Sequence, residues 1–314
     1  MSIVLDALPK AAFSVLASST TLKRLASRYG MRRPDSFARR FIAGESVAEA
    51  IEAARQIECQ GLMVTLDLLG ESVTSSDEAV RATRSYLETI AEIERAHIGR
   101  NISLKLTQLG LDVDRATCVD NLRRILDAAS TGEFFVRVDM ENSPYTDLTL
   151  EVIETVWSIG YRNVGTVIQS YLKRSDRDVA RLSGLGVRVR LVKGAYREPR
   201  EVAFQQKPEV DAAFVDLMRV LLRSGNYPAI ATHDPAMVEA TTTFATQQGI
   251  PKDTFEFQML YGIRRDLQAK LSGEGYPFRV YVPFGKEWFP YFMRRLGERP
   301  ANVGFVVRSL FREK

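Results

Sequence analysis

The sequence predicts an α/β fold in which eight βα units close into a parallel barrel. Eight short runs rich in β-branched residues recur every few tens of residues from residue 61 onward. A longer amphipathic segment separates each run from the next. No linker rich in Pro, Gly or Ser and no low-complexity tract interrupts the chain, so a second folded domain is not expected. Together these observations predict a (βα)8 barrel of the TIM type.

Helical patterns precede the first run. Leu22 and Leu25 share one helix face, and Val47 and Ile51 repeat that spacing. We therefore expect residues 1–58 to form lead-in helices that are an appendage to a catalytic barrel at residues 59–314.

The barrel segments follow in order, with helix-patterned stretches such as Asp77–His97 and Thr117–Ala129 between them. The expected strands are Leu62–Asp67, Ile102–Leu106, Phe134–Asp139, Val164–Gln169, Val187–Lys193, Ala229–His233, Phe255–Met259 and Phe278–Val282.

Composition narrows the class of protein. The 314 residues are 45% hydrophobic and 26% charged, as in ordinary soluble domains. Lys and Arg exceed Asp and Glu by only 43 to 39 and are scattered, which does not favour nucleic-acid binding. No apolar stretch reaches the roughly eighteen residues of a membrane span. The first apolar stretch is broken by Asp6 and Lys10, unlike a signal peptide.

Cysteine and histidine are scarce. Two cysteines, Cys59 and Cys118, are too few for a disulfide scaffold, so a reducing cytoplasm fits best. Two histidines, His97 and His233, leave little material for a metal centre, and we expect none.

A barrel carries its catalytic groups at the carboxyl ends of its strands. Nearly every predicted strand ends in polar residues, which a purely structural barrel would not need. The active site is therefore expected at this rim. The residues at or near these ends are Asp67, Glu71, Lys105, Asp139, Glu141, Gln169, Arg190, Lys193, Tyr196, His233, Gln258, Leu260 and Tyr281.

The cations suit a small anion. The guanidinium groups of Arg294 and Arg295 could bind a carboxylate in a bidentate manner, although such a pair is often only a solvated helix face. Lys105 lies in a strand whose alternate positions are apolar. A lysine that points into the barrel mouth needs a partner, and Asp139 is the natural candidate. That pair could be structural or functional.

Other rim residues suit a ring ligand. The amides of Gln169 and Gln258 could bind a heteroaromatic edge or be satisfied polar caps. His233 is expected to contact a ligand rather than a metal. Gly194 would let backbone approach a ligand closely.

Several familiar motifs are missing. The sequence has no Walker A motif and no Gly-x-Gly-x-x-Gly after a strand, so a dinucleotide would have to be held by the barrel itself. It also lacks a Gly-x-Ser-x-Gly elbow and a His-Glu-x-x-His helix, which removes support for hydrolase chemistry.

From about residue 60 to the end, the chain resembles the proline dehydrogenase family. The segments that carry the resemblance are Arg190–Tyr196 (RLVKGAY), Tyr281–Gly285 (YVPFG), Tyr291–Arg295 (YFMRR) with Glu298 and Asn302, Ile102–Leu106 (ISLKL), Ala231–His233 (ATH) and Phe255–Gln258 (FEFQ). The resemblance implies FAD-dependent oxidation of L-proline to Δ1-pyrroline-5-carboxylate, with electrons passed to a quinone. A pyrroline-5-carboxylate dehydrogenase would act next.

The resemblance also implies residue roles. Lys105, Arg294 and Arg295 would hold the proline carboxylate, while Tyr196, Leu260 and Tyr281 would pack on its ring. Asp139 would orient the lysine or tyrosine partners, and Arg190 would approach flavin N5. Glu71 would pair with Arg295 to close the site, and the last helix would lie over the rim. The remaining FAD contacts would be Met140, Gln169, Lys193, Gly194, Ala195, Thr232, His233 and Gln258.

Three further possibilities stay open. The amphipathic and basic stretch Phe13–Tyr29 could lie on a membrane surface or pack on the barrel. A Schiff-base aldolase would also place a lysine, Lys105 or Lys193, at a strand end. A catalytically inactive binding scaffold would be expected to lose the rim charges, which are present here.

Overall fold

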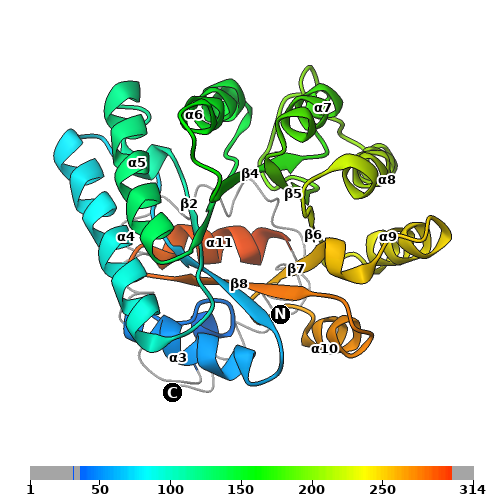
Figure 1. The fold of residues 1–314 in the computed structure, drawn as a ribbon, viewed down its shortest axis with the longest axis horizontal. Coiled ribbons are helices and arrows are strands. Elements are labelled where there is room, and N and C mark those ends of the chain that lie inside the picture. The colour runs from blue at the N-terminus through cyan, green and yellow to red at the C-terminus, as the bar shows by residue number, and fades with distance from the viewer. Residues whose placement is uncertain (1–30, 32–35, 299–314) are drawn as a thin grey trace, which may run out of the picture.

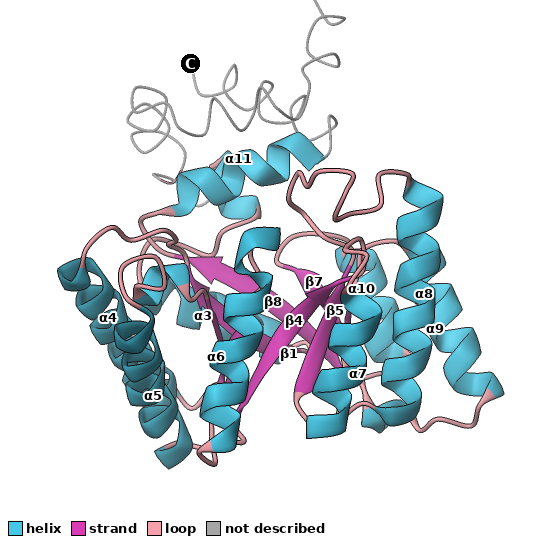
Figure 2. Ribbon diagram, turned by 90° about the horizontal axis from the view of Figure 1, so that it is seen from above, coloured by secondary structure: helices cyan, strands magenta, loops and turns pink. Residues whose placement is uncertain are grey.

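The computed structural model describes Met31 and residues 36–298. Its strands form a closed parallel barrel in which each strand pairs with its neighbours in sequence and β8 pairs with β1. Figure 1 views this barrel end-on, and Figure 2 views it from the side. The predicted fold is therefore confirmed. The strands are β1 (Met63–Leu68), β2 (Asn101–Leu104), β3 (Phe135–Val138), β4 (Val164–Gln169), β5 (Arg188–Val192), β6 (Ala229–Ala231), β7 (Glu256–Leu260) and β8 (Phe278–Phe284).

Helices surround the barrel, and several begin at a side chain that caps the first turn. Ser75, Asp114 and Asp234 each accept a backbone N–H at the start of the following helix. The outer helices are α4 (Ser76–Ala96), α5 (Arg115–Thr131), α6 (Thr146–Ser158), α7 (Ser175–Leu185), α8 (Lys207–Ser224), α9 (Pro235–Gln247) and α10 (Arg265–Gly273). Short 3-10 helices are η2 (Phe37–Arg40), η3 (Thr107–Leu109), η4 (Ser143–Tyr145) and η5 (Lys252–Thr254).

Helix α3 (Val47–Glu58) completes the ring. It begins at a capping box of Ser46 and Glu49 and packs against β1, β8 and α4. Its buried face includes Ala54 and Ile57. The described part of the lead-in segment thus packs as one member of the helical ring.

Helix α11 (Trp288–Glu298) crosses above the rim, as Figure 2 shows and as the resemblance implied. The indole N–H of Trp288 donates to Glu45 at 2.8 Å, and Gly285 N–H donates to the Gly44 carbonyl at 2.9 Å. An apolar cluster, called here the lid cluster, joins α11 to the segment around η2. Its residues are Met31, Ala38, Phe41, Ile42, Leu69, Trp288, Phe289, Tyr291, Phe292 and Met293.

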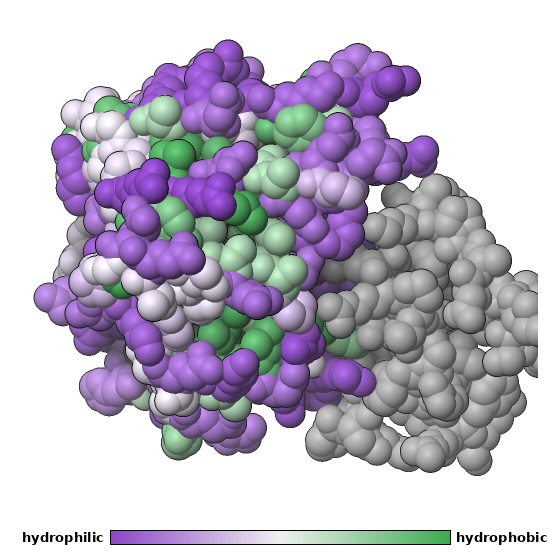
Figure 3. All heavy atoms as spheres, turned by 90° about the vertical axis from the view of Figure 1, so that its right-hand side faces the viewer, coloured by the Kyte–Doolittle hydropathy of each residue, from purple (hydrophilic) through white to green (hydrophobic). Residues whose placement is uncertain are grey.

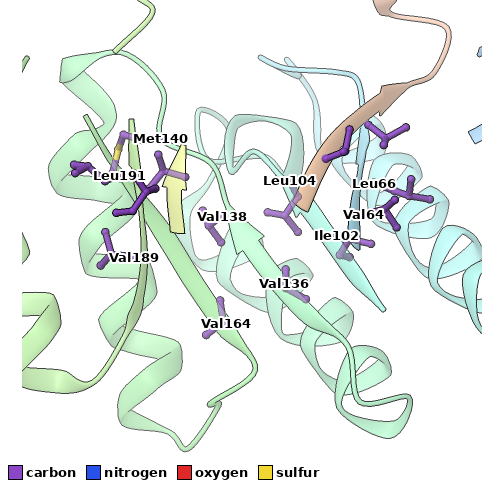
Figure 4. Packing of buried hydrophobic residues seen from close by; sticks show 14 of the residues in the cluster. Val64, Leu66, Ile102, Leu104, Val136, Val138, Met140, Val164, Val189 and Leu191 are labelled. Atoms are coloured by element: carbon purple, nitrogen blue, oxygen red, sulfur yellow. The ribbon is translucent and has the colours of Figure 1, made fainter. Parts of the chain in front are cut away.

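The two faces of the strands differ in polarity. Outward side chains such as Val64, Leu66, Ile102 and Val136 belong to the main hydrophobic core between strands and helices (Figure 4). Alternate positions face inward and are unusually polar. These inward residues include Thr65, Asp67, Ser103, Arg137, Asp139, Arg190, Glu256, Gln258, Arg279 and Tyr281.

Some expected features differ in detail or lie outside the described residues. Lys105, Asp139 and His233 follow their strands by one or two residues, a difference within the usual uncertainty of strand ends. The backbone N–H of Asp139 still donates to the Leu104 carbonyl at 2.8 Å. Phe13–Tyr29 and Asn302 are outside the described residues. None of the described helices is both long and apolar enough to span a bilayer. On the face in Figure 3, hydrophilic residues break up the hydrophobic patches.

Candidate active site

Asp139 is the centre of a buried network. One of its carboxylate oxygens accepts from Arg190 Nη1 and the other from the Tyr281 hydroxyl, both at 2.7 Å. Arg190 also donates to Ser103 at 3.1 Å, and its guanidinium carbon lies 5.2 Å from the Tyr281 ring centre. Burial, followed by the charge of Asp139, raises the Tyr281 pKa well above its usual value. The hydroxyl therefore remains a donor.

Lys105 lies directly after β2 and is buried. Burial alone would lower its pKa, but the charges of Asp67 and Asp139 raise it above the ordinary lysine value. The lysine is thus kept charged. The predicted Lys105–Asp139 pair is correct only as an electrostatic contact, because the hydrogen bonds of Asp139 go to Arg190 and Tyr281.

Asp67 is the stronger influence on Lys105, and its role was not predicted. The side chain is 1% exposed, and neither carboxylate oxygen has a hydrogen bond to a described residue. Burial raises its pKa, while Lys105 opposes that rise. The Tyr281 hydroxyl is near enough to lower the Asp67 pKa, but its hydrogen bond goes to Asp139. The sequence held one signal for the position of Asp67: it lies two residues after Thr65 and therefore on the same face of the strand.

The rim is bridged by an ion pair between the β1–α4 loop and α11. Arg294 Nη1 donates to Glu71 at 2.8 Å, with side chains 29% and 31% exposed. Burial would raise the Glu71 pKa, but the charges of Arg294 and then Lys105 lower it. The resemblance paired Glu71 with Arg295 instead. Arg295 has its guanidinium 5.3 Å from the Tyr291 ring centre.

Tyr196 completes this side of the site. Burial raises its pKa to about 12, while the charges of Lys105 and Arg294 act in the opposite direction. The loop after β5 therefore brings Tyr196 close to two of the three predicted carboxylate-binding cations, Lys105 and Arg294.

His233 joins two strand ends. Its Nε2 accepts the backbone N–H of Leu260 at 3.0 Å. The nearby backbone N–H of Thr232 donates to the Gln258 carbonyl at 3.2 Å. This places His233, Thr232 and Leu260 together at the ends of β6 and β7. No cluster of three or more metal-ligating side chains occurs in the described part of the chain.

The two predicted glutamines are both buried. Gln169 donates to the Glu141 backbone carbonyl at 2.8 Å. Gln258 donates its amide to the Glu256 carboxylate, and Glu256 also accepts two hydrogen bonds from Arg279 at 2.8 and 2.9 Å. The amide oxygen of Gln258 has no hydrogen bond to a described residue.

Lys193 belongs to a surface network at the same rim. It pairs with Asp211 and, at 2.7 Å, with Asp234. Gly194 has φ of +122°, and a Cβ there would lie 2.5 Å from the Tyr171 ring. Packing against Tyr171 therefore explains this glycine without a ligand. Of the other predicted cofactor contacts, Met140 is buried and Ala195 is exposed.

An open surface depression of about 720 Å³ lies at the other end of the barrel, where β3, β4 and β5 begin. Its lining includes Glu133, Tyr161 and Arg188. It contains none of the predicted site residues, and barrel chemistry resides at the opposite rim.

Comparisons with known proteins agree with this geometry. Residues 50–308 match the family model described as proline dehydrogenase. The chain is 41% identical to proline dehydrogenase 2 of Bacillus subtilis over 95% of this chain and 97% of that protein. It is 42% identical to proline dehydrogenase of Deinococcus radiodurans over 88% and 91%, respectively.

A solved structure shares the architecture. Proline utilization A (PutA) from Bdellovibrio bacteriovorus, inactivated by N-propargylglycine, superposes with a TM-score of 0.79 at 28% identity. The match covers 86% of this chain and 33% of that protein, so the chain spans about a third of that larger relative. The chain is an oxidoreductase and belongs to the proline dehydrogenase family.

Proposed function

We propose that the chain oxidises L-proline to Δ1-pyrroline-5-carboxylate with FAD and passes the electrons to a quinone. The observation that carries the proposal is the meeting of Lys105 and Arg294, each kept charged by acids, beside Tyr196. Tyr281 joins this group through Asp139, which also acts on Lys105. Two fixed cations next to aromatic walls suit a small cyclic carboxylate. Membership of the family supports the same reaction.

Two buried polar atoms inside the barrel support the proposal of a flavin ring there. Gln258 Oε1 and Arg190 Nε are buried and have no hydrogen bond to a described residue. Such atoms are costly to leave unmatched, and a ring with donors and acceptors along its edge would match both. FAD, when bound, supplies the electron sink that accepts hydride from the substrate.

The chain's own residues mainly position the substrate. Lys105, Arg294 and Arg295 would bind the carboxylate, while Tyr281 and Leu260 would form the wall against the ring. Asp139 would fix Tyr281 and Arg190 through its two 2.7 Å hydrogen bonds. Such fixed orientation lowers the entropy lost in reaching the reactive geometry. The lid helix α11 would exclude water from the site.

The other FAD contacts proposed are Met140, Gln169, Lys193, Gly194, Ala195, Thr232 and His233. Lys193 already forms ion pairs with Asp211 and Asp234. To bind FAD it would have to contact the cofactor in addition to these pairs or give them up. The proposed setting is the cytoplasm, with peripheral membrane contact through Phe13–Tyr29 bringing a quinone within reach. A pyrroline-5-carboxylate dehydrogenase is the proposed next enzyme.

A Schiff-base aldolase that uses Lys105 is disfavoured by the state of this lysine. Its neutral amine would have to attack a carbonyl, yet neighbouring acids raise its pKa and keep it protonated. Borohydride trapping with a carbonyl substrate would label the protein covalently only if the aldolase alternative held.

The test is a visible absorption spectrum of the purified protein before and after anaerobic addition of L-proline. A flavin spectrum that bleaches supports both the cofactor and the substrate. A flavin that stays oxidised would refute proline as substrate, and a colourless protein that FAD cannot reconstitute would refute the cofactor.

A further inference from the structure

A buried polar chain runs along the inside of β7 and β8. Glu256 and Gln258 are two residues apart on one strand and face the same side, with Gln258 nearer the rim. Gln258 pairs with Arg279 across the β7–β8 register. Glu256 and Gln258 are 2% and 3% exposed, so their hydrogen bonds are protected from water.

Glu256 can act only as an acceptor. Arg279 donates to both of its carboxylate oxygens, at 2.8 and 2.9 Å, and also donates to the Val64 carbonyl at 2.8 Å. Burial raises the Glu256 pKa, but the charge and hydrogen bonds of Arg279 lower it overall. The carboxylate therefore remains ionised and offers no proton to its neighbours.

An ionised carboxylate fixes the orientation of the amide above it. The NH2 group of Gln258 must face Glu256, because the reverse orientation would bring two acceptors together. Its carbonyl oxygen then faces away from Glu256, and this oxygen has no hydrogen bond to a described residue. The site thus presents a buried acceptor that requires an N–H or O–H group from a ligand.

We propose that Glu256 and Arg279 are positioning residues that hold the Gln258 carbonyl ready to accept the imide N–H of a flavin. The inference rests on the proposed function, because the imide is the N–H group on the ring edge of oxidised flavin. The proposal also predicts that the site prefers flavin over a flavin methylated at that nitrogen. The methylated flavin has no donor there and leaves the Gln258 oxygen without a hydrogen bond.

Binding of FAD and of 3-methyl-FAD to the apoprotein, followed by flavin fluorescence, tests the proposal. The wild-type chain should bind FAD about 10–100-fold more tightly, the usual effect of leaving a buried polar atom unmatched. Gln258→Leu removes the acceptor, together with the amide's bond to Glu256, and keeps both Arg279 bonds to that carboxylate. The ratio of the two affinities should therefore fall close to one. Gln248→Leu, at an exposed glutamine that accepts from Arg223, is the matched control and should keep the wild-type ratio.

Glu256→Gln tests the positioning role itself. The new amide has one oxygen for two Arg279 donors. With that oxygen at the Oε1 place Gln258 keeps its orientation, and with it at the Oε2 place the new NH2 meets Gln258 and inverts that amide. The orientation of Gln258 is therefore no longer fixed in this variant. FAD should then bind more weakly, while 3-methyl-FAD should be affected less. A structural role alone would weaken both flavins equally and would overturn the positioning claim.

The outcomes separate the inference from the proposed function. A wild-type chain that binds neither flavin would refute the FAD proposal. A chain that binds FAD and bleaches with proline, yet keeps the same preference against 3-methyl-FAD in Gln258→Leu, would overturn only the inference. In that case the methyl group is rejected by its size. If Gln258→Leu alters the proline KM and leaves the flavin ratio unchanged, the oxygen serves the substrate and the inference also fails.

Discussion

The hydroxyl of Tyr281 should contribute measurably to the stability of the barrel. Tyr281→Phe deletes one oxygen atom and its 2.7 Å hydrogen bond to the Asp139 carboxylate. Hydrogen bonds to charged groups contribute about 1.5–3 kcal/mol, more than those between neutral groups. Arg190 still neutralises Asp139 in the variant, so the larger cost of an unpaired buried charge is not expected. The free energy of unfolding should therefore fall by about 2 kcal/mol.

Urea denaturation with both proteins held at the same saturating FAD concentration measures this difference, because ligand binding shifts apparent stability. Tyr161→Phe is the control: its hydroxyl donates to Asp127 at 2.5 Å, but the pair is exposed. Water replaces an exposed hydrogen bond, so the control should lose less than about 1 kcal/mol. Equal losses at Tyr281 and Tyr161 would refute the argument that burial strengthens the first bond.

Three further outcomes follow from charge and exposure. Arg294→Met should raise the KM for proline at least about tenfold with FAD still bound, the usual effect of losing a charged hydrogen bond; loss of the flavin colour would place Arg294 in the cofactor site instead. Glu71→Gln should cost under about 1 kcal/mol near neutral pH, because the Arg294 pair is partly exposed. Arg294 depresses the folded-state pKa of Glu71. The stability difference should therefore be complete above the unfolded pKa of about 4.3 and disappear as pH falls through the folded value; a difference that persists in acid would contradict this origin. A thiol reagent should modify the exposed Cys59 in the native protein and reach Cys118, whose pKa burial raises to about 12, only after denaturation; two reactive thiols in the native state would contradict the packing around Cys118.

The sequence predicted the barrel because its signal is repeated. Eight β-branched runs, each followed by a helical pattern, agree with one another, so an error of a residue or two at a strand end leaves the topology intact. The sequence pattern could not predict where α3 packs. Its amphipathic pattern shows only that Ala54 and Ile57 need a partner, and the partner surface on β1 and β8 exists only after the barrel closes.

The candidate site was predicted in part. Strand ends and the resemblance placed Lys105, Asp139 and Tyr281 at one rim, and the structure brings them together. The pairing of acidic and basic side chains depends on distances across the barrel. The hydrophobic periodicity within one strand carries no information about those distances. Asp67 was placed at the rim without a role, and Glu256 was not predicted as a site residue at all. The role of an acid inside an apolar run becomes clear only when its partner on another strand is known.

Closure of the barrel by β1 and β8 constrains how the chain folds during synthesis. Met63 pairs with Arg279 in the register of these strands, and the two residues are 216 positions apart. Contacts of such long range slow folding, and a nascent chain emerges from its N-terminus. Helix α3 is therefore made long before the strand that covers it. The part of its apolar face that packs on β8 stays without that partner, exposed or bound by a chaperone, until β8 has left the ribosome.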